Sequence, residues 1–237
     1  AEAFSIPTHL LVEAGTGVGK SLAYLVPSAL LAFQNDIRVV ISSNTINLQD
    51  QLFAKDIPDV RDTLGIPFRA AILKGRANYL CRRRLDALRN GHQVAPEQTG
   101  GLVKILAWEN TTTTGDRAEL ILVDEEQNLW QHVQSTPETC LADSCPYQRQ
   151  GRCFYNQART RAERAHIIVI NHALLLLDLV MDNRLLPEYD YVVIDEAHHL
   201  EAVATDQFGL QIAQRDVLSF LGSVYYESGG IPGGILS

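Results

Sequence analysis

The chain has 237 residues, of which 46% are hydrophobic, and a formal net charge of −8 at pH 7. This content is ample for a packed core and predicts a globular protein, either one large domain or one domain with an insertion. The longest apolar stretch, residues 21–33, is short for a bilayer and contains Pro27, which argues against a transmembrane helix. Residues 1–4 lack the positive charge of a secretory signal, so we expect a cytoplasmic protein.

Five segments have the pattern of buried parallel strands, because they are short, rich in Val, Ile and Leu, and followed by polar or glycine-containing turns. They are residues 9–13, 37–43, 69–73, 166–170 and 191–194. Helical patterns cover residues 20–33, where Pro27 predicts a kink, and residues 44–64. This alternation predicts an α/β protein with a doubly wound parallel sheet.

Residues 14–21 read Ala-Gly-Thr-Gly-Val-Gly-Lys-Ser, between the first predicted strand and the first predicted helix. Glycines let successive backbone N–H groups converge on phosphate oxygens, and a helix N-terminus adds positive potential. The pattern predicts a P-loop that binds ATP through Ala14, Gly15, Thr16, Gly17, Val18, Gly19, Lys20 and Ser21. Lys20 is expected to reach the β and γ phosphates, and Ser21 to bind Mg²⁺. Ala14 stands where the strict pattern has Gly, which helicase-type P-loops accept; the alternative is a glycine-rich turn without a ligand.

The alternation fails between about residues 81 and 160, where long polar stretches and all four cysteines occur, and we interpret this part as an insertion. Beyond Leu200 a helical pattern begins. A glycine-rich run at residues 229–234 then follows with no closing strand, which we interpret as a truncation.

The four cysteines are Cys81, Cys140, Cys145 and Cys153, and the last three fall within fourteen residues. Disulfides are not expected, because a nucleotide-binding protein is expected in the cytosol, which is reducing. Structural zinc sites usually have tighter C-x2-C spacing, whereas widely spaced thiolates suit the larger body of a 4Fe-4S cluster. We therefore predict a 4Fe-4S cluster, with a zinc site and free buried cysteines as the alternatives.

Positive charge is concentrated in two segments of this acidic chain. Residues 69–90 hold seven Lys and Arg against one acid, and residues 149–164 hold five against one. Such asymmetry suits a local surface for phosphate. Arg82, Arg83 and Arg84, with aromatic side chains around them, are candidates for contacts to single-stranded nucleic acid. The alternatives are basic residues that only solvate helix faces and aromatic residues that pack around the cluster.

A P-loop needs a carboxylate after another buried strand to hold Mg²⁺, and a group that activates water. Two segments fit, residues 192–198 (Val-Val-Ile-Asp-Glu-Ala-His) and residues 120–125 (Leu-Ile-Leu-Val-Asp-Glu). We favour the first, because the second lies inside the insertion. Asp195 is then the Mg²⁺ ligand and Glu196 the catalytic base, whereas His198 either senses nucleotide, contacts a partner domain or makes a structural hydrogen bond.

The P-loop, the Asp-Glu-Ala-His motif and the four cysteines between them give the sequence its resemblance to a known family. It resembles the XPD-type iron-sulfur helicases of superfamily 2, in particular their bacterial DinG branch. Residues 45–51, 74–81 and 171–175 also carry the likeness, which extends over residues 9–202.

The resemblance implies a first RecA-like domain at residues 1–80 and 154–200, an iron-sulfur domain at 81–153, and the start of a helical Arch domain at 201–237. It implies a monomeric, nucleoid-associated DNA helicase that depends on ATP, moves 5′ to 3′ and acts on single-stranded or forked DNA. Thr45 and Gln51 would lie in the segment that touches single-stranded DNA. The second RecA-like domain is absent, so we expect this chain to bind nucleotide but not to unwind DNA alone.

Two other functions fit parts of the sequence. One is a P-loop ATPase with a structural zinc module, which metal analysis would separate from the helicase. The other is a DNA-binding fragment without activity, which an ATP hydrolysis assay would separate.

Overall fold

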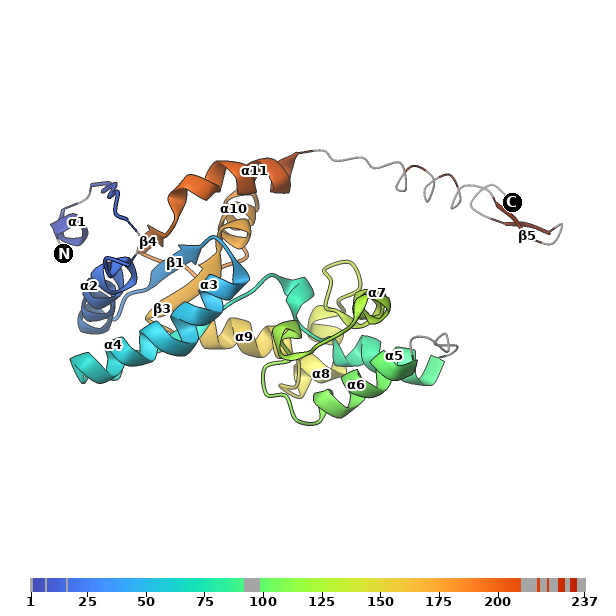
Figure 1. The fold of residues 1–237 in the computed structure, drawn as a ribbon. Coiled ribbons are helices and arrows are strands. Elements are labelled where there is room, and N and C mark those ends of the chain that lie inside the picture. Colours follow the sequence, from blue (N-terminus) through green and yellow to red (C-terminus); the bar gives the residue numbers. More distant parts are fainter. Residues whose placement is uncertain are drawn as a thin grey trace. The chain divides into compact units, whose positions relative to one another are not determined.

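The computed structural model describes residues 2–6, 8–15, 17–91, 99–209, 217, 221, 226–228 and 231–233. The chain divides into two compact units, Ala1–Leu200 and Glu201–Ser237. The first unit contains a parallel sheet with helices packed against it (Figure 1).

The sheet has four strands in the order β2 (Ala70–Ile72), β3 (Ile167–Asn171), β1 (Val39–Ser43) and β4 (Tyr191–Ile194). All three pairings are parallel, and Val40 lies opposite Ile168 on one side and Val192 on the other. The predicted α/β class with a parallel sheet is therefore confirmed.

Helices cover both faces of the sheet, and successive side chains of each strand point to opposite faces. The odd-numbered residues of β1 and β3 are buried in a cluster with α2 (Lys20–Asn35) and α4 (Ile57–Leu64). The even-numbered hydrophobic residues belong to a second cluster, with α9 (Phe154–Glu163) and α10 (His172–Val180). These two layers hold the sheet ends, and thus the site described below, in place.

The predicted helix at residues 44–64 forms as three helical segments. They are α3 (Ile46–Gln51), a π-helical segment η1 (Leu52–Asp56) and α4. Thr45 caps the first segment, and its hydroxyl accepts a hydrogen bond from the Leu48 N–H at 3.2 Å. The other predicted helix continues through Pro27 as α2, so the kink expected there stays a prediction.

The predicted strand at residues 9–13 does not form, and that expectation was wrong. The segment has no regular structure, and Leu10, Leu11 and Val12 are 68%, 90% and 69% exposed. A strand is stabilised by ladder hydrogen bonds to a neighbour, and none of the four strands pairs with this segment. The apolar run Leu10–Val12 therefore did not suffice to predict a strand.

The predicted insertion consists mostly of helices. The helices between β2 and α9 are η2 (Arg76–Asn78), α5 (Arg82–Gly91), α6 (Thr99–Glu109), η4 (Arg117–Glu119), α7 (Asp124–Val133), η5 (Ala142–Ser144) and α8 (Pro146–Arg149). Figure 1 shows α5, α6, α7 and α8 gathered together. Leu85, Ile105 and Leu129 from these helices share one buried cluster with Ile168 of β3. The insertion is therefore packed into the same core as one face of the sheet.

Residues 79–81 fasten the insertion by backbone hydrogen bonds. The Leu80 N–H donates to the Gly115 carbonyl at 2.9 Å, and the Cys81 N–H donates to the Val133 carbonyl at 2.8 Å. Tyr79 and Leu80 form isolated antiparallel bridges with Asp116 and Gln134. The chain thus enters the insertion between two of its later segments.

The remaining elements are short. They are α1 (Glu2–Ser5), η6 (Ala197–His199), α11 (Leu200–Phe208), and the antiparallel strands β5 (Tyr226–Ser228) and β6 (Ile231–Gly233). The helical pattern predicted beyond Leu200 is present in α11. Across the part of the chain that the structure describes, no helix combines the length and apolar character needed to cross a membrane.

Candidate active site

The P-loop turns directly into helix α2. Gly17 and Gly19 have φ angles of 77° and 83°, in the left-handed region that side chains disfavour. Gly19 is the residue before the helix, so the first amides of α2 have no partners within the helix and lie at its positive end. Ala14, Gly15 and Val18 lie on the same open loop, whereas Thr16 is outside the described residues. The local geometry is that of an anion-binding turn.

The acidic pair follows strand β4 at the carboxyl edge of the sheet. The Asp195 N–H donates to the Ser42 carbonyl at 2.8 Å, which ties the pair to the end of β1. Glu196 is the next residue and has a φ of 54°, a left-handed conformation that costs a non-glycine residue about 1–3 kcal/mol. The turn between β4 and η6 thus holds both carboxylates in a strained backbone.

The P-loop and the acidic pair meet through an ion pair. Lys20 Nζ lies 2.6 Å from Glu196 Oε1, and both side chains are about a quarter exposed. This hydrogen bond raises the pKa of Lys20, with further help from the Asp195 charge, and lowers the pKa of the Glu196 carboxyl. Both groups are therefore charged at neutral pH.

Tyr24, which was not among the predicted site residues, contacts the carboxylate of Asp195. Its hydroxyl donates to Asp195 Oδ2 at 3.1 Å. Burial, followed by the Asp195 charge, raises the pKa of Tyr24 well above its ordinary value, so the hydroxyl stays a neutral donor. The nearby Ser21 side chain partly offsets this rise in pKa, so Tyr24 lies close to both predicted Mg²⁺ ligands. Its position one helical turn after Lys20 was the available signal.

A buried hydrogen bond lies beside the carboxyl ends of strands β1 and β4. Ser42 Oγ lies 2.7 Å from Nδ1 of His172, and neither residue is exposed. Burial lowers the pKa of His172, so its imidazole is neutral at pH 7. Because the Ser42 carbonyl also accepts from the Asp195 N–H, His172 stabilises the turn that carries the acidic pair.

His198 contacts the acidic pair without being buried. Its Nδ1 lies 3.5 Å from Glu196 Oε2, and its ring lies against that of His199 with centroids 4.0 Å apart. The rival acidic pair, Asp124 and Glu125, begins helix α7 and follows no strand. Of the two predicted segments, residues 192–198 include a strand, and their Glu196 pairs with Lys20.

The four cysteines are free thiols, and Cys145 is buried. Burial raises the pKa of the Cys153 thiol, and the charges of Cys81, Cys140 and Cys145 raise it further, so these three side chains lie within electrostatic reach of Cys153. Within the described residues, no three His, Cys, Asp or Glu side chains are arranged to hold a single metal ion. The structure thus gathers the cysteines without showing a formed metal site.

The predicted nucleic-acid contacts differ in their surroundings. Gln51 is exposed at the end of α3, next to the capped turn at Thr45. Arg82 donates to Glu109 Oε1 at 2.5 Å and lies over the Phe154 ring, with 4.0 Å to the centroid.

The other two predicted arginines are also engaged within the insertion. Arg83 donates to the Thr139 carbonyl, and Arg84 donates to the carbonyls of Gln134 at 2.9 Å and Gln131 at 2.8 Å. All three guanidinium groups therefore stabilise the insertion internally.

Comparison with known families supplies independent information. The family model described as DEAD/DEAH box helicase matches residues 2–155, and the one described as DEAD_2 matches residues 141–217. The chain belongs to the DEAD/DEAH box helicases. The resemblance to XPD- and DinG-type helicases is thereby confirmed.

Two relatives of this DEAD/DEAH box helicase chain are named as ATP-dependent helicases. It is 38% identical to the ATP-dependent DNA helicase YoaA of Escherichia coli, over 88% of the chain and 33% of the relative. It is 40% identical to the ATP-dependent helicase DinG of Mycobacterium tuberculosis, over 84% of the chain and 32% of the relative. The protein of Bacillus subtilis named 3′-5′ exonuclease DinG is 36% identical, over 88% of the chain and 22% of the relative. The chain thus spans a third or less of these relatives.

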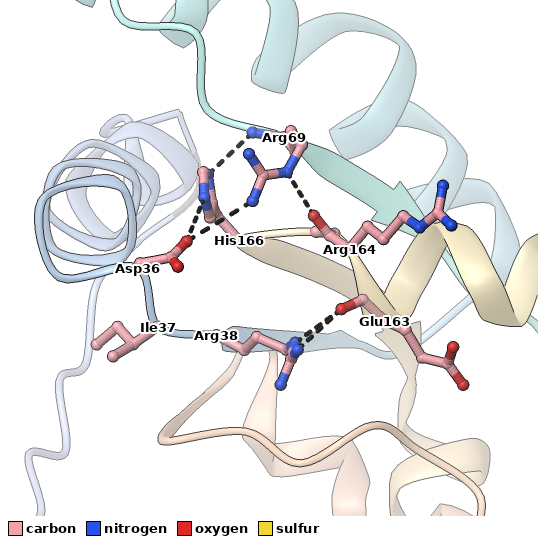
Figure 2. Close-up of a pocket in the computed structure, with 8 residues that line it drawn as sticks. Asp36, Ile37, Arg38, Arg69, Glu163, Arg164 and His166 are labelled. Atoms are coloured by element: carbon pink, nitrogen blue, oxygen red, sulfur yellow. Dashed lines mark hydrogen bonds and ion pairs between the residues drawn. The ribbon is translucent and has the colours of Figure 1, made fainter.

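A small pocket of the helicase chain lies at the opposite end of the sheet (Figure 2). Arg38 donates to the Glu163 carbonyl, and Arg69 donates to the Arg164 carbonyl at 2.5 Å. His166 lies 3.3 Å from Asp36, and burial lowers its pKa. These residues precede or join the amino ends of the strands, far from the edge that carries Asp195, so the pocket is separate from the acidic pair.

Proposed function

We propose that this chain carries the ATP site of an ATP-dependent DNA helicase. One observation carries the proposal: Lys20 of the P-loop lies 2.6 Å from Glu196, the residue after Asp195. A P-loop lysine and an acidic pair at the carboxyl edge of a parallel sheet are the parts that ATP hydrolysis requires. The names of the relatives from Escherichia coli and Mycobacterium tuberculosis support the same activity.

In this proposal, residues 14–21 bind the phosphates of ATP. Lys20 contacts the β and γ phosphates, while the Ser21 hydroxyl and the Asp195 carboxylate hold Mg²⁺. These two residues suit Mg²⁺ because both offer oxygen ligands and because both lie close to Tyr24, whose hydroxyl donates to Asp195. Bound Mg²⁺ would neutralise charge on the phosphates.

Glu196 is the proposed catalytic base. The phosphates of ATP compete for the Lys20 ammonium, so nucleotide binding releases the Glu196 carboxylate from its 2.6 Å ion pair. The freed carboxylate then orients a water molecule and accepts its proton as water attacks the γ phosphorus. The bond between that phosphorus and the β–γ bridging oxygen breaks, giving ADP and phosphate.

The same proposal extends to DNA. Closure and reopening of two RecA-like domains around ATP would move the protein 5′ to 3′ along single-stranded or forked DNA. Residues 1–80 and 154–200 would form the first of these domains, residues 81–153 the insertion, and residues 201–237 the start of an Arch domain. Thr45 and Gln51 are the proposed DNA contacts, and the protein is proposed to act as a monomer in the cytoplasm.

Cys81, Cys140, Cys145 and Cys153 would hold a 4Fe-4S cluster. The donor set fits, because four free thiols influence one another electrostatically and no other cysteine is present. When bound, the cluster would supply a rigid structural pin for the insertion. Arg82, Arg83 and Arg84 would then mainly fix the segments that carry the cysteines. Contact with DNA would be their secondary role.

ATP hydrolysis by the complete protein tests the nucleotide site. Lys20→Ala and Glu196→Gln should each lower DNA-stimulated hydrolysis at least about a hundredfold, because each removes a transition-state group. Glu125→Gln, which alters the rival acidic pair, is the matched control and should hydrolyse ATP at the normal rate. Full activity in both site variants, or loss of activity in the control alone, would assign the chemistry elsewhere.

Metal analysis of anaerobically purified protein tests the cluster. We expect about four irons with matching sulfide per chain, and loss of both in Cys145→Ser. Zinc without sulfide would replace the cluster by the zinc module and leave the ATP site untouched.

A further inference from the structure

Lys74 is a buried lysine that the proposed ATP chemistry does not use. Its side chain is 2% exposed, and its Nζ lies 2.8 Å from Asp50 Oδ1 and 2.6 Å from Asp116 Oδ2. An ammonium group at this depth is stable only when paired, and here one positive charge faces two carboxylates. The site therefore depends on all three residues being together.

The two carboxylates belong to different parts of the first unit. Asp50 lies in α3, between Gln49 and the exposed Gln51. Asp116 lies in the insertion, where it forms a bridge with Tyr79 and caps η4 through the Ala118 N–H at 3.0 Å. Lys74 itself directly follows the end of the sheet, so it joins three separate segments.

Further hydrogen bonds fix α3 and Lys74 to their neighbours. Gln49 is fully buried, and its Nε2 donates to the carbonyls of Leu73 and Val169, both at 3.0 Å, which fixes α3 to the ends of β2 and β3. The Lys74 N–H donates to the buried Tyr79 hydroxyl at 3.0 Å. Movement of the insertion at Tyr79 or Asp116 must therefore displace Lys74, and with it α3.

We propose that Lys74 is a positioning residue that makes α3 and the cysteine-bearing insertion one mechanical unit. The proposal rests on the proposed function, in which the turn at Thr45 and the exposed Gln51 contact single-stranded DNA. The ion pairs of Lys74 hold this contact segment at a fixed position against the insertion. DNA bound by one then orders the other.

Carboxylate variants of the complete protein test the proposal without removing the buried charge. Asp50→Asn and Asp116→Asn each leave Lys74 one partner. Each should raise the DNA concentration for half-maximal stimulation of hydrolysis roughly tenfold, a usual size for coupling between contacting residues. The two single variants should shift this concentration by similar amounts, because both carboxylates act through the same Lys74 ammonium. Hydrolysis without DNA and the KM for ATP should stay unchanged.

Glu126→Gln is the matched control. Glu126 is also buried and pairs with Lys104 at 2.7 Å, but this pair joins α6 to α7 inside the insertion. It should leave the half-maximal DNA concentration unchanged. Normal DNA dependence in both aspartate variants, or an equal shift in Glu126→Gln, would overturn the proposal.

Amide hydrogen exchange separates this inference from the proposed function. Asp116→Asn should speed exchange in α3, which is remote in sequence, and Glu126→Gln should not. Unchanged exchange in α3 would refute the coupling. If the unaltered protein shows no DNA-stimulated hydrolysis, the helicase assignment fails and with it the role on DNA, while exchange still decides the coupling.

Discussion

At the scale of single residues, the P-loop depends on backbone conformations that only glycine adopts easily. Gly19 has a φ of 83°, and a Cβ added there would meet no atom within 4 Å. The cost of a side chain at this position is therefore conformational and not steric. Alanine in a left-handed conformation costs about 1–2 kcal/mol, which corresponds to roughly tenfold in affinity.

Gly19→Ala should thus weaken MgATP binding about tenfold, measured by titration calorimetry. Gly65→Ala is the control, because Gly65 ends α4 with a φ of 63° and equally open surroundings. It should lower the free energy of unfolding by a similar amount and leave ATP affinity unchanged. Equal ATP affinities for both variants would show that the left-handed turn is not needed for binding.

The Lys20–Glu196 pair makes a prediction about protonation. Because the hydrogen bond from Lys20 lowers the pKa of Glu196, Lys20→Ala should raise that pKa towards its ordinary value of 4.5. The pair stabilises the fold above the ordinary carboxyl pKa, and this contribution is lost as the pH falls through the lowered pKa. NMR titration of the side-chain carboxyl measures the change.

Glu126 serves as the internal reference for this titration. Its pKa is lowered by a hydrogen bond from Lys104, far from the P-loop in sequence, so it should titrate identically in both proteins. An unchanged Glu196 midpoint would mean that the ion pair does not persist in solution.

Sequence reasoning found the charged residues of the site but missed their neutral supports. Lys20, Asp195 and Glu196 belong to motifs whose spacing reflects their chemistry. Tyr24 and His172 act through hydrogen bonds to residues that are distant in sequence. Helical spacing from Lys20 was the one signal for Tyr24, and nothing in the local pattern distinguishes His172 from an ordinary core residue.

At the scale of elements, strand prediction succeeded for the four segments that pair in the sheet. β1 and β3 lie inside the sheet, and all five residues of β1 are buried, so their apolar runs reflect real burial. Residues 9–13 also contain an apolar run but have no pairing partner among the four strands. Composition predicts the tendency to form a strand, whereas pairing depends on the rest of the fold.

The insertion depends on a close contact that its sequence does not reveal. A Cβ added to Gly115 would lie 2.3 Å from the Phe154 ring, and its φ is 65°. The glycine lets Phe154 pack over the segment that also receives the Leu80 N–H. Gly115→Ala should lower the free energy of unfolding by about 2–4 kcal/mol, through both backbone strain and overpacking.

Gly151→Ala isolates the backbone part of that effect. Gly151 has a φ of 67° but nothing within 4 Å of an added Cβ, so its substitution should cost only about 1–2 kcal/mol. Chemical denaturation of the two variants gives the comparison. Equal stabilities would mean that the Phe154 contact relaxes without cost.

At the scale of the whole molecule, the order of motifs in the sequence was more informative than any element. It predicted the α/β class, the parallel sheet and the family, which the fold and the family match bear out. It did not predict that the insertion shares a hydrophobic core with the sheet, because that contact joins residues such as Leu85 and Ile168 across the chain. Nor did it predict the buried Lys74 that joins the insertion to α3.

The most direct test of the helicase assignment is strand separation by the complete protein on a forked DNA duplex, with the unaltered protein and Glu196→Gln compared side by side. We predict that the unaltered protein separates the strands only with ATP and Mg²⁺. We expect Glu196→Gln still to bind ATP and DNA but to separate no strands. Strand separation without ATP, or equal separation by both proteins, would contradict an ATP-driven helicase whose catalytic base is Glu196.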